Sequence, residues 1–109
     1  MKAFQDRKKK FEEKFARDMD LQFKVECRAC KKFGLWIAEM IGLSGDDAAS
    51  YAIEIVTANL EKPGIDDVIE RVRKDLDQKK VEISDHKLHF KLETLMEECK
   101  EALIEETSL

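Results

Sequence analysis

Residues 4–41 read FQDRKKKFEEKFARDMDLQFKVECRACKKFGLWIAEMI and decide the fold. The stretch contains no proline, and its only glycine is Gly34. Its apolar side chains recur in steps of three, four and seven residues, the spacing that stacks side chains on one face of an α-helix. They are Phe4, Phe11, Phe15, Met19, Phe23, Cys27, Cys30, Phe33, Ile37 and Ile41. The pattern predicts one long helix of about 57 Å, at about 1.5 Å per residue.

The first helix should end near Gly42, because glycine accepts the positive φ that closes many helices. A second helix is predicted over 45–61, with Ser44 as its N-cap and two aspartates in its first turn. The apolar face predicted for this second helix consists of Ala49, Ala52, Ile53, Val56 and Leu60.

Two more helices are predicted after the turn at Pro63-Gly64. Asp66 can cap the third helix, and Ser84 opens the fourth. The buried stripe expected on the third helix is Val68 or Ile69, then Val72 and Leu76. The apolar face expected on the fourth helix is Leu88, Leu92, Leu95, Met96, Cys99 and Leu103.

The later helices are too short to cover the whole first helix, since they span only about 15 to 22 residues each. Apolar side chains are dense from Phe23 to Ile41, whereas the residues before Asp18 are mostly charged. We therefore expect an all-α fold, a four-helix bundle over 19–109, with residues 1–18 as an extension that is mobile when the protein is free. Short connections favour antiparallel neighbours around one core, with Phe33 and Trp36 at its centre.

Composition sets the broad class of protein. A chain of 109 residues with 43% hydrophobic residues can build one core. Its net charge of −4 disfavours nucleic acid as a partner, and no apolar run reaches the length that membrane insertion needs. The N-terminus lacks the continuous apolar core of a signal peptide, and three cysteines give no disulfide framework. We expect a cytoplasmic protein that is a monomer when free.

The extension combines phenylalanines with positive charge. Phe4, Phe11 and Phe15 flank Lys8-Lys9-Lys10, a pattern also compatible with a membrane-surface anchor or with a charged tail. Burying three phenylalanines releases less free energy than ordering about 15 residues costs. The segment should therefore become ordered only against a large partner that also supplies polar contacts.

Catalytic and metal-binding patterns are weak. Cys27-x-x-Cys30 lies in mid-helix on the apolar face, where cysteines are usually small core residues rather than redox thiols. Adding Cys99 and a histidine could complete a zinc site, and His86 with His89 could bind a metal or sense pH, but a solvated helix face explains the histidines too. No phosphate-binding loop or nucleophile–base set occurs, so we expect no enzymatic activity and no resident cofactor or metal.

Short sequences along nearly the whole chain resemble one family in the same order. They are Phe4-x-Asp6-Arg7, Glu13-Lys14-Phe15-Ala16-x-Asp18, Leu21-x-Phe23-Lys24, Gly34-Leu35-Trp36-x-Ala38-Glu39, Gly42-Leu43-Ser44-Gly45, Tyr51-Ala52, Pro63-Gly64 and Lys74-Asp75-Leu76. The ordered set resembles the zeta subunit of alphaproteobacterial F-type ATP synthases.

This resemblance implies a four-helix inhibitor of ATP hydrolysis by the catalytic head. Its N-terminal segment would enter an interface between the alpha and beta subunits, beside the gamma shaft, and block rotation in the hydrolytic direction. The segment would bind these partners through Phe4, Asp6, Arg7, Phe11, Glu13, Lys14, Phe15 and Asp18. The protein would then lie peripheral to the inner-membrane synthase. Nucleotide binding is also implied, without assigned residues.

A different class of function stays open. The same segment could belong to a helical adaptor that docks another protein and leaves the synthase untouched. A metal or redox protein built on Cys27, Cys30 and Cys99 is the third alternative.

Overall fold

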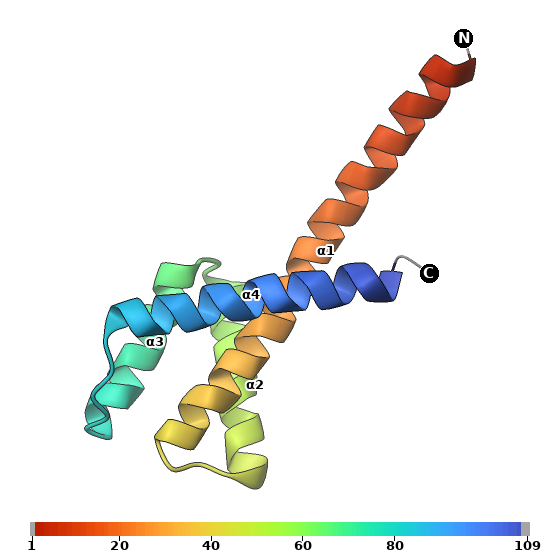
Figure 1. The fold of residues 1–109 in the computed structure, drawn as a ribbon. Helices are drawn as coiled ribbons and strands as arrows, with labels where there is room; N and C mark the ends of the chain where they lie inside the picture. Colours follow the sequence, from red (N-terminus) through yellow and green to blue (C-terminus); the bar gives the residue numbers. More distant parts are fainter. Residues whose placement is uncertain (1, 108–109) are drawn as a thin grey trace.

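Four α-helices make up the fold of this computed structural model (Figure 1). They are α1 (Lys2–Met40), α2 (Gly45–Glu61), α3 (Ile65–Gln78) and α4 (Asp85–Thr107). The structure assigns a backbone conformation to residues 2–107 and describes side chains for residues 20–106. No strand occurs in this described part, and the prediction of an all-α four-helix bundle with a long first helix is confirmed. The predicted mobility concerns residues 1–18, whose side chains lie outside the described range.

Helix α1 contacts all three other helices. Both α2 and α4 pack against it, α3 bridges α2 and α4, and α4 crosses α1 obliquely (Figure 1). The contacts that join these helices run in antiparallel order. Examples are Arg28 with Glu106, Tyr51 with Asp75 and Arg73 with Asp85.

The core lies where α1 meets the three other helices. Its buried apolar residues on α1 are Val25, Ala29, Cys30, Phe33, Ile37 and Ala38. Those on α3 are Val68, Ile69, Val72 and Leu76. Those on α4 are Leu88, Leu92, Leu95, Cys99 and Leu103. The stripes predicted for the third and fourth helices are confirmed, with both Val68 and Ile69 buried and Met96 only partly so.

The turn between α1 and α2 follows the predicted Gly42 signal. Gly42 has φ +85°, its N–H donates to Glu39 O at 3.2 Å, and Leu43 N–H donates to Ala38 O at 2.8 Å. This pair of bonds is the Schellman motif, which satisfies carbonyl groups that the helix end leaves open. Ser44 takes the N-cap position of α2 as predicted, although its side chain makes no capping hydrogen bond.

Gly34 sets the closest approach of α1 and α2. A Cβ at this position would lie 2.7 Å from the Cα of Ala52, closer than real Cβ contacts. Only glycine lets the two backbones come so near without displacement. The close contact turns Ala52 and Ile55 toward α1, and both are fully buried.

The face predicted for the second helix is correct at Ala52, which is fully buried, and in part at Val56, which packs partly buried against the core, but it is wrong at the other three positions. The buried residues of α2 are Tyr51, Ala52, Ile55 and Asn59. Ile53 and Leu60, which the prediction placed in the core, are 60% and 50% exposed, and Ala49 is exposed too.

Tertiary contacts explain this rotation of α2. Tyr51 Oη donates to Asp75 Oδ2 at 2.7 Å, and Gly64 N–H donates to Asn59 Oδ1 at 3.4 Å. These bonds let two polar side chains face inward without unsatisfied groups. The apolar pattern of α2 alone does not show where these hydrogen-bond partners lie, so it cannot predict that Tyr51 and Asn59 are buried.

Of the N-caps predicted for α3 and α4, only the one for α4 is confirmed. Gly64, with φ +141°, is the N-cap of α3, and Asp66 lies in the first helical turn, so the predicted Asp66 cap is wrong. Glycine takes this position because a side chain there would be strained. Ser84 Oγ accepts a hydrogen bond from Lys87 N–H at 3.2 Å, which confirms that Ser84 caps α4.

Candidate functional site

The predicted partner-binding residues all belong to the first half of α1. They are Phe4, Asp6, Arg7, Phe11, Glu13, Lys14, Phe15 and Asp18. Their side chains lie outside the described residues, so their role stays a prediction. What the structure describes is the body that holds the second half of the same helix.

The contacts that hold α1 in the bundle are mainly apolar. Phe33 and Ile37 are fully buried, and the ring of Phe33 contacts that of Trp36 at a centroid distance of 5.8 Å. Lys91 of α4 places its Nζ 5.4 Å from the Trp36 ring centroid, a cation–π contact. Among the described residues, the buried part of α1 begins at Val25.

A two-pronged ion pair joins α1 to the end of α4. Arg28 Nη1 and Nη2 donate to the two carboxylate oxygens of Glu106, each at 3.0 Å. The bond from Arg28 lowers the pKa of Glu106 below its usual value. Because both groups face solvent, salt should weaken the pair. The pair fixes α4 close to the point where α1 enters the bundle.

A buried tyrosine joins α2 to α3. Asp75 accepts the hydrogen bond of Tyr51 and also pairs with Arg71, which in turn reaches Glu54 at 3.5 Å. Burial, together with the bond to Asp75, raises the pKa of Tyr51 above its usual value. A separate set of contacts joins α3 to α4, where Arg73 donates to Asp85 and to the carbonyl of Ile83, each at 2.6 Å. Three helices are thus tied by polar contacts around the core.

The cysteines have the character of core residues. Cys30 and Cys99 are buried, Cys27 is half-buried, and all three are free thiols. Burial raises the pKa of Cys27 and raises that of Cys30 to about 12, with the neighbouring Glu26 adding to both. Since the thiolate is the reactive form, this environment opposes redox or metal chemistry at neutral pH.

Alkaline pH should destabilise the fold through Cys30. In the unfolded chain its thiol ionises from the ordinary pKa of 9.0, whereas in the native state the pKa is about 12. The native state therefore retains a proton that the unfolded state loses, and stability falls as pH rises from about 9 to 12, by about 1 kcal/mol per pH unit. Urea unfolding at several pH values should give a shallower alkaline decline for Cys30→Ala than for the unaltered chain. Parallel declines would contradict this assignment.

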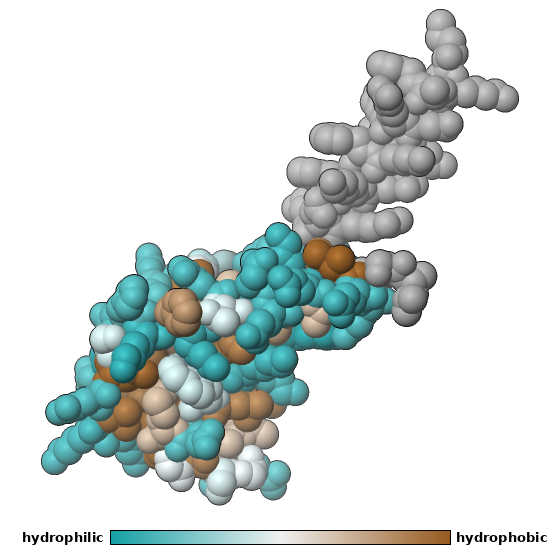
Figure 2. Space-filling model, in the orientation of Figure 1, coloured by the Kyte–Doolittle hydropathy of each residue, from teal (hydrophilic) through white to brown (hydrophobic). Residues whose placement is uncertain are grey.

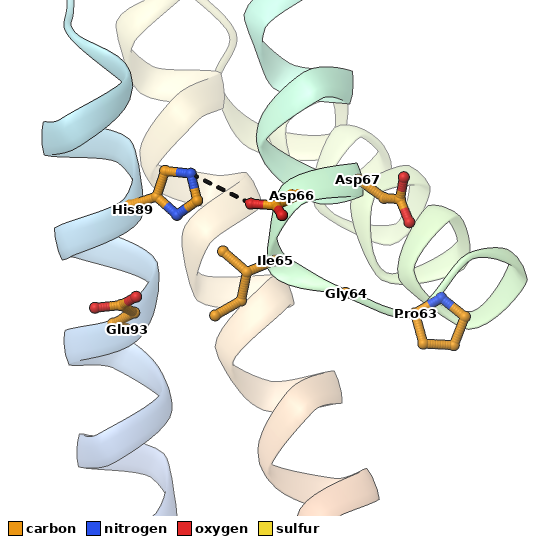
Figure 3. A pocket seen from close by; sticks show the side chains of 7 residues that line it. All are labelled: Pro63, Gly64, Ile65, Asp66, Asp67, His89 and Glu93. Carbon is orange, nitrogen blue, oxygen red and sulfur yellow. Dashed lines mark ion pairs between the residues drawn. The ribbon is translucent and has the colours of Figure 1, made fainter.

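A shallow hollow lies beside the turn that joins α2 to α3. It has a volume of about 440 Å³ and is lined by Pro63, Gly64, Ile65, Asp66, Asp67, His89 and Glu93 (Figure 3). Asp66 and His89 face each other across it, with Oδ1 and Nε2 3.6 Å apart (Figure 3). Three carboxylates in the lining would repel the phosphates of a nucleotide, so the hollow gives the implied nucleotide no suitable place.

The histidines do not form a joint metal site in this structure. His86 is exposed, and His89 is directed at Asp66. Within residues 20–106, no three His, Cys, Asp or Glu side chains come together in a way that could hold a metal ion. Nor is any helix in the described part long and apolar enough to cross a membrane.

Exposed apolar residues near α1 are the feature that sequence reasoning missed. Phe23 is 54% exposed, and Ile53 and Leu60 of α2 are also open to solvent. The helical spacing of Ile53 and Leu60 predicts a core stripe, whereas the structure leaves both residues exposed.

One comparison with known proteins identifies a family, and another finds a similar solved structure. The model of the family described as ATPase inhibitor subunit zeta matches residues 1–102. A protein solved by solution NMR has 43% sequence identity and a TM-score of 0.67, over 79% of this chain and 98% of that chain. The comparison with curated proteins gave no match.

Proposed function

The chain belongs to the ATPase inhibitor subunit zeta family, and from this we propose how it acts on the ATP synthase. Its general role is that of a regulatory, non-enzymatic inhibitor of the ATP synthase. We assign the inhibitory contact to residues 1–18, which would enter an alpha/beta catalytic interface next to the gamma shaft. The bundle that begins at residue 19 would then carry this segment and anchor it.

The observation that carries the proposal is the extent of the family match, which begins at residue 1 and thus includes the segment. Among the described residues, the fully buried positions of α1 begin at Val25, with Leu21 partly buried against the same core, and these residues belong to the proposed bundle. Residues 1–20 also differ in charge from the rest of the chain. They carry seven basic and five acidic side chains, a net charge of +2. Because the whole chain has a net charge of −4, the remaining residues carry a net charge of −6.

A segment wedged between a catalytic interface and a rotating shaft can oppose one direction of rotation more than the other. We therefore infer that the protein blocks the hydrolytic direction while permitting synthesis. The phenylalanines would supply apolar contact, and the charged side chains between them would supply orientation. A segment that becomes ordered only on binding makes its affinity depend on both kinds of contact.

The test compares both directions of the same enzyme. Purified cognate ATP synthase in sealed vesicles is assayed for ATP hydrolysis, and then for proton-driven ATP synthesis, with increasing amounts of the full chain. We expect the rate of hydrolysis to fall to a small fraction of its uninhibited value, while the rate of synthesis changes by less than about twofold. Equal loss of both rates would contradict the directional block, and unchanged hydrolysis would contradict the inhibitory role itself.

A further inference from the structure

Helix α2 has a second apolar face that the bundle leaves open. We name it the α2 seam, and it consists of Ala49, Ile53, Val56 and Leu60. These residues follow one another in steps of four, three and four, so they form one line along the helix. Ile53 is 60% exposed and Leu60 is 50% exposed, whereas Val56 is half-buried and packs against the core at the edge of this face. A line of this kind is usual at helix contacts and unusual on a free surface.

The α2 seam is turned away from α3. The side of α2 that meets α3 is marked by Tyr51 and Glu54, which contact Asp75 and Arg71. The side that meets α1 is marked by Ala52 at Gly34. At 100° per residue the seam lies beyond Ala52, on the far side of α2 from Tyr51. Figure 2 shows apolar side chains interspersed with hydrophilic ones on the face of the described body that is turned to the viewer.

Phe23 extends this apolar surface onto α1. It precedes Gly34 by eleven residues, which is three helical turns, so it faces the same side of α1 as Gly34, about 16 Å nearer the N-terminus. Helix α2 continues for only nine residues after Ala52, or about 14 Å, to Glu61. Phe23 therefore lies just beyond the last turn of α2, which explains why it is 54% exposed.

The charge around the α2 seam selects the kind of surface that can cover it. Helix α2 carries no basic residue. Of its carboxylates, Asp46 lies beside the α2 seam at 100° per residue, whereas Glu54 pairs with Arg71 on the α3 side. An apolar surface with basic residues at its edge would complement it, and an acidic surface would be repelled.

The size of the patch argues against a second copy as the occupant. Phe23 and the α2 seam together provide five residues, whereas a stable interface uses about 20 to 30 residues on each side. So small a patch can contribute only when its partner is already held by another contact, because the second contact then forms at high effective concentration. Residues 1–18 supply such a contact if they bind the catalytic head.

We propose that Phe23 and the α2 seam form a second docking surface for the catalytic head of the ATP synthase, against an apolar patch with a basic edge. This inference rests on the proposed function, since the head is the partner that residues 1–18 would hold. It gives the bundle a direct part in binding. The docked bundle would slow dissociation of the inhibitor, while the extent of block would still depend on the N-terminal segment.

The experiment uses the full chain with Ile53→Gln and Leu60→Gln combined, and Phe90→Gln as the matched control. Phe90 is 67% exposed on α4, a helix on another side of α1. Hydrolysis by the cognate catalytic head is titrated with each chain, and the dissociation rate is measured on immobilised head. We expect the double variant to need about tenfold more protein for half inhibition and to dissociate about tenfold faster, with the same final extent of inhibition. Phe90→Gln should match the unaltered chain.

The possible outcomes separate the two proposals. Inhibition by the unaltered chain, with identical titrations for the double variant, would overturn the docking surface and leave the proposed function standing. No inhibition by the unaltered chain would overturn both. Sedimentation at the assay concentrations tests the other occupant, because a dimer of the unaltered chain that the double variant abolishes would assign the α2 seam to a second copy. Circular dichroism melting confirms that the exposed substitutions leave the fold intact.

Discussion

A chain that begins at residue 19 should fail to inhibit ATP hydrolysis at concentrations where the full chain inhibits almost completely. The reason is that the proposed inhibitory contact consists only of residues 1–18, which this chain lacks. We expect the half-inhibitory concentration to rise by more than about a hundredfold, equivalent to more than about 2.8 kcal/mol of binding free energy. The measurement is a titration of ATP hydrolysis by the purified cognate head.

The truncated chain must be shown to fold before its inactivity is interpreted. Its far-UV circular dichroism and its unfolding by urea should resemble those of the full chain, because the described core begins at Val25. A full-length chain with Phe11→Ser and Phe15→Ser removes the aromatic contact without shortening the helix, and it should lose most of the inhibition as well. Full inhibition by the truncated chain would place the inhibitory site in the bundle.

The largest loss of stability is expected from Phe33→Ala. Phe33 is fully buried and in contact with the Trp36 ring, so truncation removes apolar contact and leaves a cavity. Such substitutions cost about 3 to 5 kcal/mol. Because domains of this size are stable by only about 5 to 15 kcal/mol, the variant should be close to unfolding at 37 °C. Urea unfolding at 25 °C measures the free energy directly.

Phe90→Ala is the matched comparison for that prediction. It removes the same atoms from a side chain that is 67% exposed, and it should change the free energy of unfolding by less than about 0.5 kcal/mol. If both variants lost the same stability, the burial of Phe33 would not be the cause.

Much of the fold could be predicted because each helix carries a strong local signal. The bounds of α2 agree with the predicted 45–61, since a serine, two aspartates and a Pro-Gly turn enclose it. The buried faces of α3 and α4 also agree, because each of these helices has one dominant apolar stripe. Where only one stripe exists, periodicity is enough to orient a helix.

Helix α2 could not be oriented from its own residues, because it has two apolar faces. Ile53 and Leu60 are more apolar than Tyr51 and Asn59, so hydrophobicity alone favours the wrong face. The choice depends on Asp75, which lies 24 residues beyond Tyr51 and satisfies its hydroxyl group. The candidate site is limited in the same way. Residues 1–18 have a recognisable sequence pattern, but the surface that they would bind belongs to another protein, so this chain alone cannot show the contact.

The glycine at the crossing of α1 and α2 has a consequence for sequence variation in proteins of this fold. A chain with alanine at position 34 would need its second helix to move outward, because the space for a Cβ ends at the Ala52 backbone. No smaller residue at position 52 can compensate, since the nearest atom there is a Cα. Folding alone should therefore tolerate many residues at Ile53 and Leu60 before it tolerates one at Gly34. A library of substitutions selected for folded protein should recover almost only glycine at that position.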